Sequence, residues 1–90
     1  MAETAEENIL KLYPNPAATL LNVEFNSTTA GSITMYLLDM TGRLQKLSET
    51  KAAEGENAFN LDVENLPDGL YLFVIVQGDY REMKKIVINK

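Results

Sequence analysis

The sequence predicts an all-β fold, an antiparallel β-sandwich of about seven short strands forming a single domain. Three observations carry this prediction. Apolar and polar residues alternate over short runs, turn-forming residues recur about every 8–12 positions, and no run sustains a helical period. Ninety residues are enough for one modest hydrophobic core but not for a second.

The first half of the chain predicts four strands, at residues 9–13, 21–26, 33–38 and 43–48. The first ends at Pro14-Asn15-Pro16, where two prolines cannot continue a hydrogen-bonded ladder. Residues 33–38 carry few polar side chains, so we expect a central strand that is covered on both faces. Residues 39–42 form a tight turn, in which Gly42 can take a positive φ, and the next strand returns as a hairpin arm.

The second half predicts three more strands, at residues 59–64, 70–76 and 80–88, after a hydrophilic loop at residues 49–55. Leu66-Pro67-Asp68-Gly69 has strong turn chemistry, because proline presets φ, aspartate bonds the backbone and glycine tolerates a positive φ. Residues 70–76 form the most apolar stretch and predict a core strand. A tight turn at residues 77–79 leads into the last strand.

Composition excludes several kinds of chemistry. The chain has no cysteine and no histidine, so it can form no disulfide, thiolate zinc site or Ser-His-Asp triad. No calcium-loop or phosphate-loop motif is present, and the carboxylates fall mostly in turns, where aspartate is common for backbone reasons. We therefore expect no enzymatic activity, no catalytic residues, no cofactor and no metal.

Charge and hydropathy limit the partners. The net charge of −5 argues against nucleic acid, since nucleic-acid binding needs a basic face. No apolar run approaches the roughly 20 residues that a membrane-spanning helix requires. Residues 1–11 are expected to be an acidic leader or linker remnant without the features of a signal peptide, and residues 12–90 the folded domain.

Four local signatures occur in a fixed order along the chain. They are Leu12-Tyr13-Pro14-Asn15-Pro16-Ala17, Asp39-Met40-Thr41-Gly42-Arg43, Leu66-Pro67-Asp68-Gly69-Leu70-Tyr71 and Lys84-Lys85-Ile86-Val87-Ile88-Asn89-Lys90. Together they resemble the type A C-terminal sorting domain of the type IX (Por) secretion system of Bacteroidetes. The resemblance covers residues 12–90, nearly the whole chain.

This resemblance implies both fold and function. It implies an immunoglobulin-like antiparallel β-sandwich of about seven strands. It also implies a secretion and sorting signal for a larger cargo protein in the same natural chain, exported through the periplasm to the outer-membrane surface or the extracellular space. The implied partners are the type IX translocon and a sortase-like protease that removes the domain.

The resemblance also assigns residues. Pro14 and Pro16 match the paired prolines of the family, and Gly69 and Tyr71 match its Gly-x-Tyr element. We interpret these four, with Asp39 and Gly42, as a structural motif. Tyr71 resembles a corner tyrosine, whose ring packs inside while its hydroxyl bonds the backbone.

The final strand is the candidate recognition element for the translocon and sortase, comprising Lys84, Lys85, Ile86, Val87, Ile88 and Lys90. Four of the eight basic residues lie in the last ten positions, which gives the chain a positive end. If the strand lies at a sheet edge, a partner could capture it by β-augmentation, and a weak homodimer could form through the same edge. The alternative is that its lysines only discourage aggregation of an edge strand.

A second function remains open at this point, that of an immunoglobulin- or fibronectin-like binding module for carbohydrate or a surface protein. In a carbohydrate-binding module, the four tyrosines would be the candidates for stacking against a sugar ring. They are spread over four predicted strands, which favours roles in packing. A structural spacer is the third interpretation.

Overall fold

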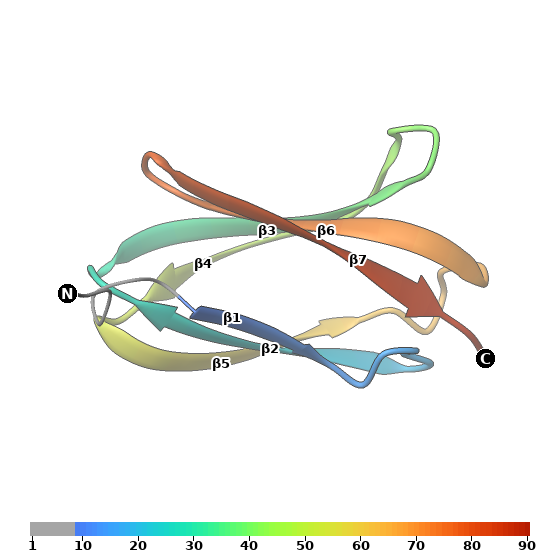
Figure 1. Cartoon of the computed structure of the whole chain (residues 1–90), viewed down its shortest axis with the longest axis horizontal. Coiled ribbons are helices and arrows are strands. Elements are labelled where there is room, and N and C mark those ends of the chain that lie inside the picture. Colours follow the sequence, from blue (N-terminus) through green and yellow to red (C-terminus); the bar gives the residue numbers. More distant parts are fainter. Residues whose placement is uncertain (1–8) are drawn as a thin grey trace, which may run out of the picture.

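A computed structural model describes residues 9–90 as two antiparallel β-sheets packed face to face (Figure 1). Most of the expected acidic leader, residues 1–8, lies outside the described residues. The predicted all-β sandwich of seven strands is confirmed. The strands are β1 (Ile9–Tyr13), β2 (Leu20–Ser27), β3 (Gly31–Asp39), β4 (Leu44–Ala52), β5 (Gly55–Asp62), β6 (Gly69–Gln77) and β7 (Tyr80–Ile88).

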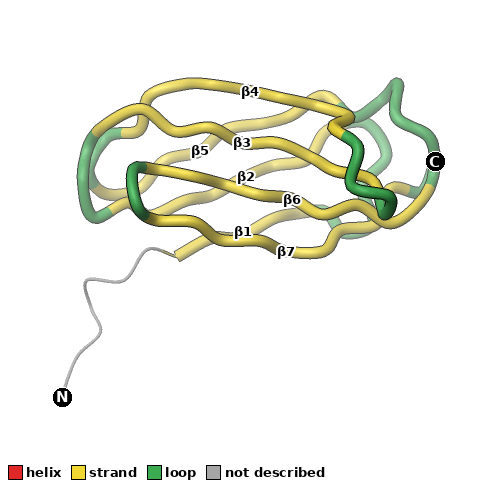
Figure 2. Tube along the Cα trace, turned by 90° about the horizontal axis from the view of Figure 1, so that it is seen from above, coloured by secondary structure: helices red, strands yellow, loops and turns green. Residues whose placement is uncertain are grey.

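The two sheets differ in size and in their edges. One has three strands in the order β1-β2-β5, and the other has four in the order β4-β3-β6-β7, which lie side by side in Figure 2. The predicted hairpins β3–β4 and β6–β7 both lie in the four-stranded sheet. This order makes β4 and β7 edge strands of the larger sheet. Between residues 9 and 90 there is no helix that could cross a membrane.

The core lies between the two sheets and follows the alternation of the sequence. In β2, Leu21, Val23 and Phe25 are buried, while the residues between them are exposed or half-buried. Phe25 and Phe73 are the largest fully buried side chains, one from each sheet. Full burial of such a side chain stabilises the fold by roughly 1.5–3 kcal/mol, so these alternating positions hold the sheets together.

The predicted loop at residues 49–55 is wrong. Strand β4 continues to Ala52 and β5 begins at Gly55, so only residues 53–54 connect them. Thr50 pairs with Ile33, and Ala52 is buried opposite Gly31. The polar residues of this stretch belong to an edge strand, where charged side chains are favoured because they discourage edge-to-edge association.

The folded unit extends further toward the N-terminus than the expected start at residue 12. Strand β1 begins at Ile9, and Leu10 pairs with Phe25 in the adjacent strand. Leu10 is only 4% exposed and belongs to the hydrophobic core. Residues 9–11 therefore stabilise the sandwich and are more than a linker.

The expectation that residues 33–38 are covered on both faces is also wrong. Strand β3 is central, between β4 and β6, and its inward residues Ile33, Met35 and Leu37 are buried. On its other face, Tyr36 and Leu38 are only half-buried, because no part of residues 9–90 forms a layer over them. The apolar character of this strand therefore has two origins, the core on one side and an apolar outer surface on the other.

Candidate recognition surface

Strand β7, which carries the candidate recognition element, is an edge strand, which is the condition for capture by β-augmentation. Among residues 9–90 it pairs as a strand only with β6, from Gly69 opposite Ile88 to Gln77 opposite Tyr80. Ile86 and Ile88 face the core and are each 1% exposed, while Val87 is 37% exposed. The structure thus divides the six predicted residues into two core residues and a surface group of Lys84, Lys85, Val87 and Lys90.

The end of β7 is covered by the segment that follows β1. The amide of Val87 donates a hydrogen bond to Asn15 Oδ1 at 2.9 Å, and the Val87 carbonyl accepts one from the Ala17 amide at 2.8 Å. The amide of Asn89 donates to the Ala17 carbonyl at 2.9 Å. These bonds occupy the outward backbone groups near Val87, so the predicted β-augmentation cannot occur there while residues 15–17 remain in place.

The first and last sequence signatures therefore meet in space. Cis peptide bonds precede both Pro14 and Pro16, and Asn15 between them aims its side chain at β7. Ala17 is fully buried and forms a bridge with Ile88. Sequence reasoning missed this contact, because 72 positions separate Asn15 from Val87 and no local pattern links them.

Lys90 is held by the turn that precedes β6. Its amide donates to Asp68 Oδ1 at 3.1 Å, and its ammonium group donates to the carbonyls of Leu66, at 2.7 Å, and Glu64. Lys84 and Lys85 are exposed and form no hydrogen bond or ion pair with residues 9–90. Of the three predicted lysines, these two are the ones with ammonium groups available to a partner.

The free part of the β7 edge lies upstream of Val87. Backbone groups of alternate residues in an edge strand point away from the sheet, so Arg81, Met83 and Lys85 share the orientation of Val87. Lys84 lies on the side of β7 that faces the other sheet, and Lys85 lies on the outer side. Positive charge therefore flanks the open stretch of the edge on both sides.

Tyr71 has the predicted corner geometry. Its ring is 4% exposed, and its hydroxyl donates to the Pro67 carbonyl at 2.5 Å. Burial, followed by the negative charges of Asp39 and Asp68, raises the pKa of the Tyr71 hydroxyl. Gly69 begins β6 with φ of +155°, which side-chain-bearing residues rarely adopt. The Gly-x-Tyr element thus fixes the entry into the central strand β6.

Asp39 organises the β3–β4 turn. Its Oδ1 accepts hydrogen bonds from the Thr41 hydroxyl at 2.6 Å, the Thr41 amide at 2.9 Å and the Arg43 amide at 3.0 Å. The Thr41 hydroxyl bond, together with the Arg43 amide, lowers the pKa of the Asp39 carboxyl. Gly42 has φ of +89°, as the turn requires. The predicted structural roles of Asp39 and Gly42 agree with this geometry.

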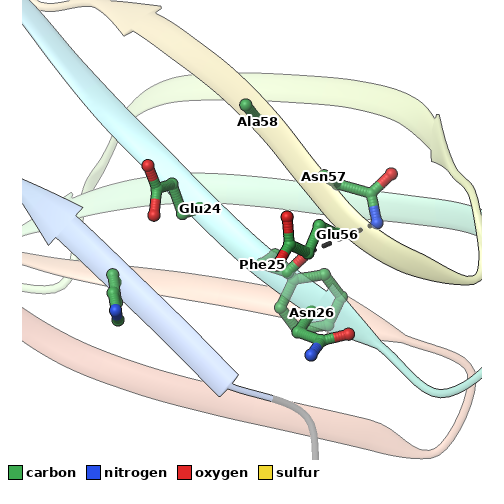
Figure 3. A pocket seen from close by; sticks show the side chains of 7 residues that line it. Glu24, Phe25, Asn26, Glu56, Asn57 and Ala58 are labelled. Carbon is green, nitrogen blue, oxygen red and sulfur yellow. Dashed lines mark hydrogen bonds between the residues drawn. The ribbon is translucent and has the colours of Figure 1, made fainter.

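A shallow depression of about 390 Å³ lies on the outer side of the three-stranded sheet (Figure 3). Five of its seven lining residues have polar side chains, among them Glu24, Asn26 and Glu56, and Asn57 Nδ2 donates to the Phe25 carbonyl at 3.3 Å. Its one aromatic residue, Phe25, is 1% exposed and offers no platform for stacking a sugar ring. Across residues 9–90 no group of side chains is arranged to hold a metal ion.

Comparison with known families identifies the chain. Residues 11–89 match the family described as the secretion system C-terminal sorting domain, and the chain belongs to this family. Its members are the C-terminal sorting signals of type IX secretion cargo. The resemblance carried by the four signatures is confirmed, and the domain is a sorting signal that directs secretion.

One solved structure supports the fold, and a second gives a weaker match. Dimeric latent PorU from Porphyromonas gingivalis is similar to this chain with a TM-score of 0.72 and 18% sequence identity, over 91% of this chain and 9% of PorU. A β-glucosidase from Listeria innocua in complex with glucose gives a TM-score of 0.49 and 16% identity, over 93% of this chain and 16% of that enzyme. This chain thus spans a small fraction of both proteins. No curated protein matches it.

Proposed function

We propose that this domain delivers a cargo protein, joined upstream of β1, to the type IX translocon by presenting the exposed lysines of β7. The domain acts as the sorting signal that the secretion machinery recognises and as a substrate of that machinery, and it catalyses no reaction itself. The cargo passes through the periplasm and ends on the outer-membrane surface or outside the cell. The observation that carries the proposal is the edge position of β7, with Lys84 and Lys85 exposed and unpaired within residues 9–90.

The charge distribution supports recognition at this end of the molecule. The last ten residues contain four basic side chains and one acidic side chain, a net charge of +3. Since the whole chain carries −5, the remaining residues carry −8. A compact positive site on an acidic molecule orients the domain toward an acidic receptor and speeds productive encounter.

The sortase-like protease is the second proposed partner. Cleavage that releases the cargo falls in the chain before β1, since Leu10 is already packed in the core. A weak homodimer through the open stretch of the β7 edge is compatible with the same geometry. The binding-module alternative gains no support from the polar depression on the three-stranded sheet.

The test uses a reporter protein fused ahead of the 90-residue chain in a type IX-competent cell. We expect the reporter at the surface, and several-fold less of it for the triple variant Lys84→Ala/Lys85→Ala/Lys90→Ala. The matched control removes three basic residues elsewhere, Lys11→Ala/Arg43→Ala/Lys46→Ala, and should be delivered normally. Retention of the unaltered fusion in the periplasm would refute the sorting function. Normal delivery of the triple variant would refute recognition through the terminal lysines alone.

A further inference from the structure

The outer face of the four-stranded sheet is apolar. This face consists of the alternate residues of β4, β3, β6 and β7 that point away from the three-stranded sheet. Ten of them are apolar or aromatic: Tyr36, Leu38, Leu44, Leu47, Leu70, Leu72, Val74, Val76, Met83 and Val87. None of them belongs to the core cluster between the sheets. Val74 is buried, at 1% exposure, whereas the other nine are half-buried or exposed, so core packing does not explain those nine.

One row of side chains on this face crosses all four strands. Leu47 lies opposite Tyr36, Tyr36 opposite Val74, and Val74 opposite Met83. The two ends of the row are open, since Leu47 is 53% and Met83 is 50% exposed. Leu44 and Leu70, in adjoining rows, are 56% and 40% exposed. A contiguous apolar patch of this kind on a small domain marks an interaction surface, whereas isolated exposed apolar residues need no explanation.

The opposite outer face provides an internal comparison. On the three-stranded sheet, the outward positions of β2 and β5 carry mostly asparagine and carboxylate side chains, and Leu20 is the one large apolar side chain among them, at 46% exposure. Strand β1 adds Lys11 and Tyr13 to this face, and Tyr13, which is 44% exposed, donates a hydrogen bond to the Glu24 carboxylate. Both faces belong to the same fold and meet the same solvent. The apolar character of the four-stranded face therefore reflects a requirement beyond folding.

Charge on the apolar face selects the kind of partner. Its charged residues are Glu49 and Lys51 on β4, and Arg81 and Lys85 on β7, which sum to +2. The whole chain carries −5, so the face is opposite in sign to the molecule. If this face paired with the same face of a second copy, two surfaces of net positive charge would meet. An acidic partner would instead attract the positive face.

We propose that the outer face of the four-stranded sheet docks onto a protein of the secretion machinery whose contact surface has an apolar centre and an acidic rim. The inference rests on the proposed sorting function. The cargo is joined to the domain upstream of β1, which belongs to the other sheet. Leu47 and Met83 are the apolar anchors, and Arg81 and Lys85 meet the acidic rim.

The experiment places Leu47→Glu and Met83→Glu separately in the reporter fusion and measures surface delivery. Both side chains point into solvent, so folding should be little affected, which thermal denaturation checks. We expect each variant to reduce delivery several-fold. Leu20→Glu, at a similarly exposed position on the other sheet, is the matched control and should leave delivery unchanged. If either glutamate variant fails to fold, Leu47→Ser or Met83→Ser replaces it.

Charge reversal tests the nature of the partner. Arg81→Glu/Lys85→Glu should also reduce delivery, whereas Lys11→Glu on the three-stranded sheet should not. If the double variant were delivered fully while Met83→Glu reduced delivery, the proposal that the partner has an acidic rim would be wrong. Full delivery of Leu47→Glu and Met83→Glu would overturn the docking face but leave the sorting function intact. If the unaltered fusion did not reach the surface, both the sorting function and the docking face would be refuted.

A second copy of the chain is the competing occupant. Light scattering of the purified chain, at a concentration low enough to dissociate a weak homodimer through the β7 edge, should give the mass of one copy. A mass of two copies that falls to one with Met83→Glu would assign the face to self-association and overturn the proposed partner. Unaltered mass in both proteins supports docking onto the secretion machinery when the delivery results agree.

Discussion

At the scale of single residues, Tyr71 connects a turn to the core. Its buried ring packs between the sheets, and its hydroxyl bonds the Pro67 carbonyl in the turn that leads into β6. Because β6 is central in the four-stranded sheet, this bond fixes where the most apolar strand begins. This hydrogen bond is partly buried.

We predict that Tyr71→Phe destabilises the domain by about 1 kcal/mol, because the ring remains while the bond to Pro67 is lost. For a domain of this size, that lowers Tm by about 4–8 °C. Thermal denaturation followed by circular dichroism measures the change. Tyr36→Phe is the control, since the Tyr36 hydroxyl forms no hydrogen bond with the described part of the chain. Equal Tm values for Tyr71→Phe and the unaltered protein would contradict the corner role.

Asp39 makes the stability of the β3–β4 turn depend on pH. Its folded pKa lies below the ordinary value of 3.8, so the carboxylate stabilises the fold fully above that value and loses this effect as pH falls through the folded pKa. We predict that Asp39→Asn lowers Tm at pH 7, and that the difference from the unaltered protein shrinks as pH is lowered below about 4. Asp79→Asn, in the other hairpin turn, is the control. A difference that stayed constant from pH 7 to pH 2 would contradict this role.

At the scale of elements, β7 combines two roles along its length. Its end is held by the core and by residues 15–17, whereas its first part presents an unpaired edge with exposed basic side chains. Residues 15–17 therefore have a structural role beyond following β1. They cover the terminal part of an edge that would otherwise be open to strand pairing with another chain.

We predict that Asn15→Ala speeds hydrogen exchange of the Val87 amide about fivefold, since it removes a bond of roughly 1 kcal/mol. The other amides of β7 that pair with β6 should exchange at nearly unaltered rates. Asn60→Ala, at an exposed position on β5, is the control. Exchange resolved residue by residue by NMR is the measurement. Protection of Val87 that survived the substitution would show that the Asn15 side chain does not hold this edge.

Local chemistry explains which elements could be predicted. Alternation located β2 and the inner face of β3, and turn residues located both hairpins, since these signals act over a few positions. The end of β4 was missed because Glu49 and Lys51 indicate a loop by composition, while pairing with β3 makes them a strand. The contact of residues 15–17 with β7 and the anchoring of Lys90 depend on tertiary packing, which no local pattern encodes.

At the scale of the whole molecule, the sandwich has two unlike outer surfaces. The three-stranded sheet is polar and shallowly hollowed, whereas the four-stranded sheet is apolar with a basic edge. The sequence pattern predicted the central strands β3 and β6, but it assigned all the apolar residues of these strands to packing in the core. The inward apolar residues of β3 and β6 form the core, and the proposed docking surface accounts for their outward apolar residues.

The terminal signature serves folding, and we propose that it also serves recognition, so only an experiment that separates the two roles is informative. Deleting residues 84–90 removes Ile86 and Ile88 from the core and the backbone partners of residues 15–17. We predict that this deletion unfolds the domain, because each buried isoleucine contributes roughly 1.5–3 kcal/mol to a total stability of about 5–15 kcal/mol. The triple variant Lys84→Ala/Lys85→Ala/Lys90→Ala keeps both isoleucines, loses only the side-chain bonds of Lys90, and should stay folded with Tm lowered by less than about 10 °C. Circular dichroism and thermal denaturation of the two purified proteins measure this difference. If the deletion variant folded cooperatively, the buried end of β7 would be dispensable for the sandwich, and loss of export on deletion could then be attributed to recognition.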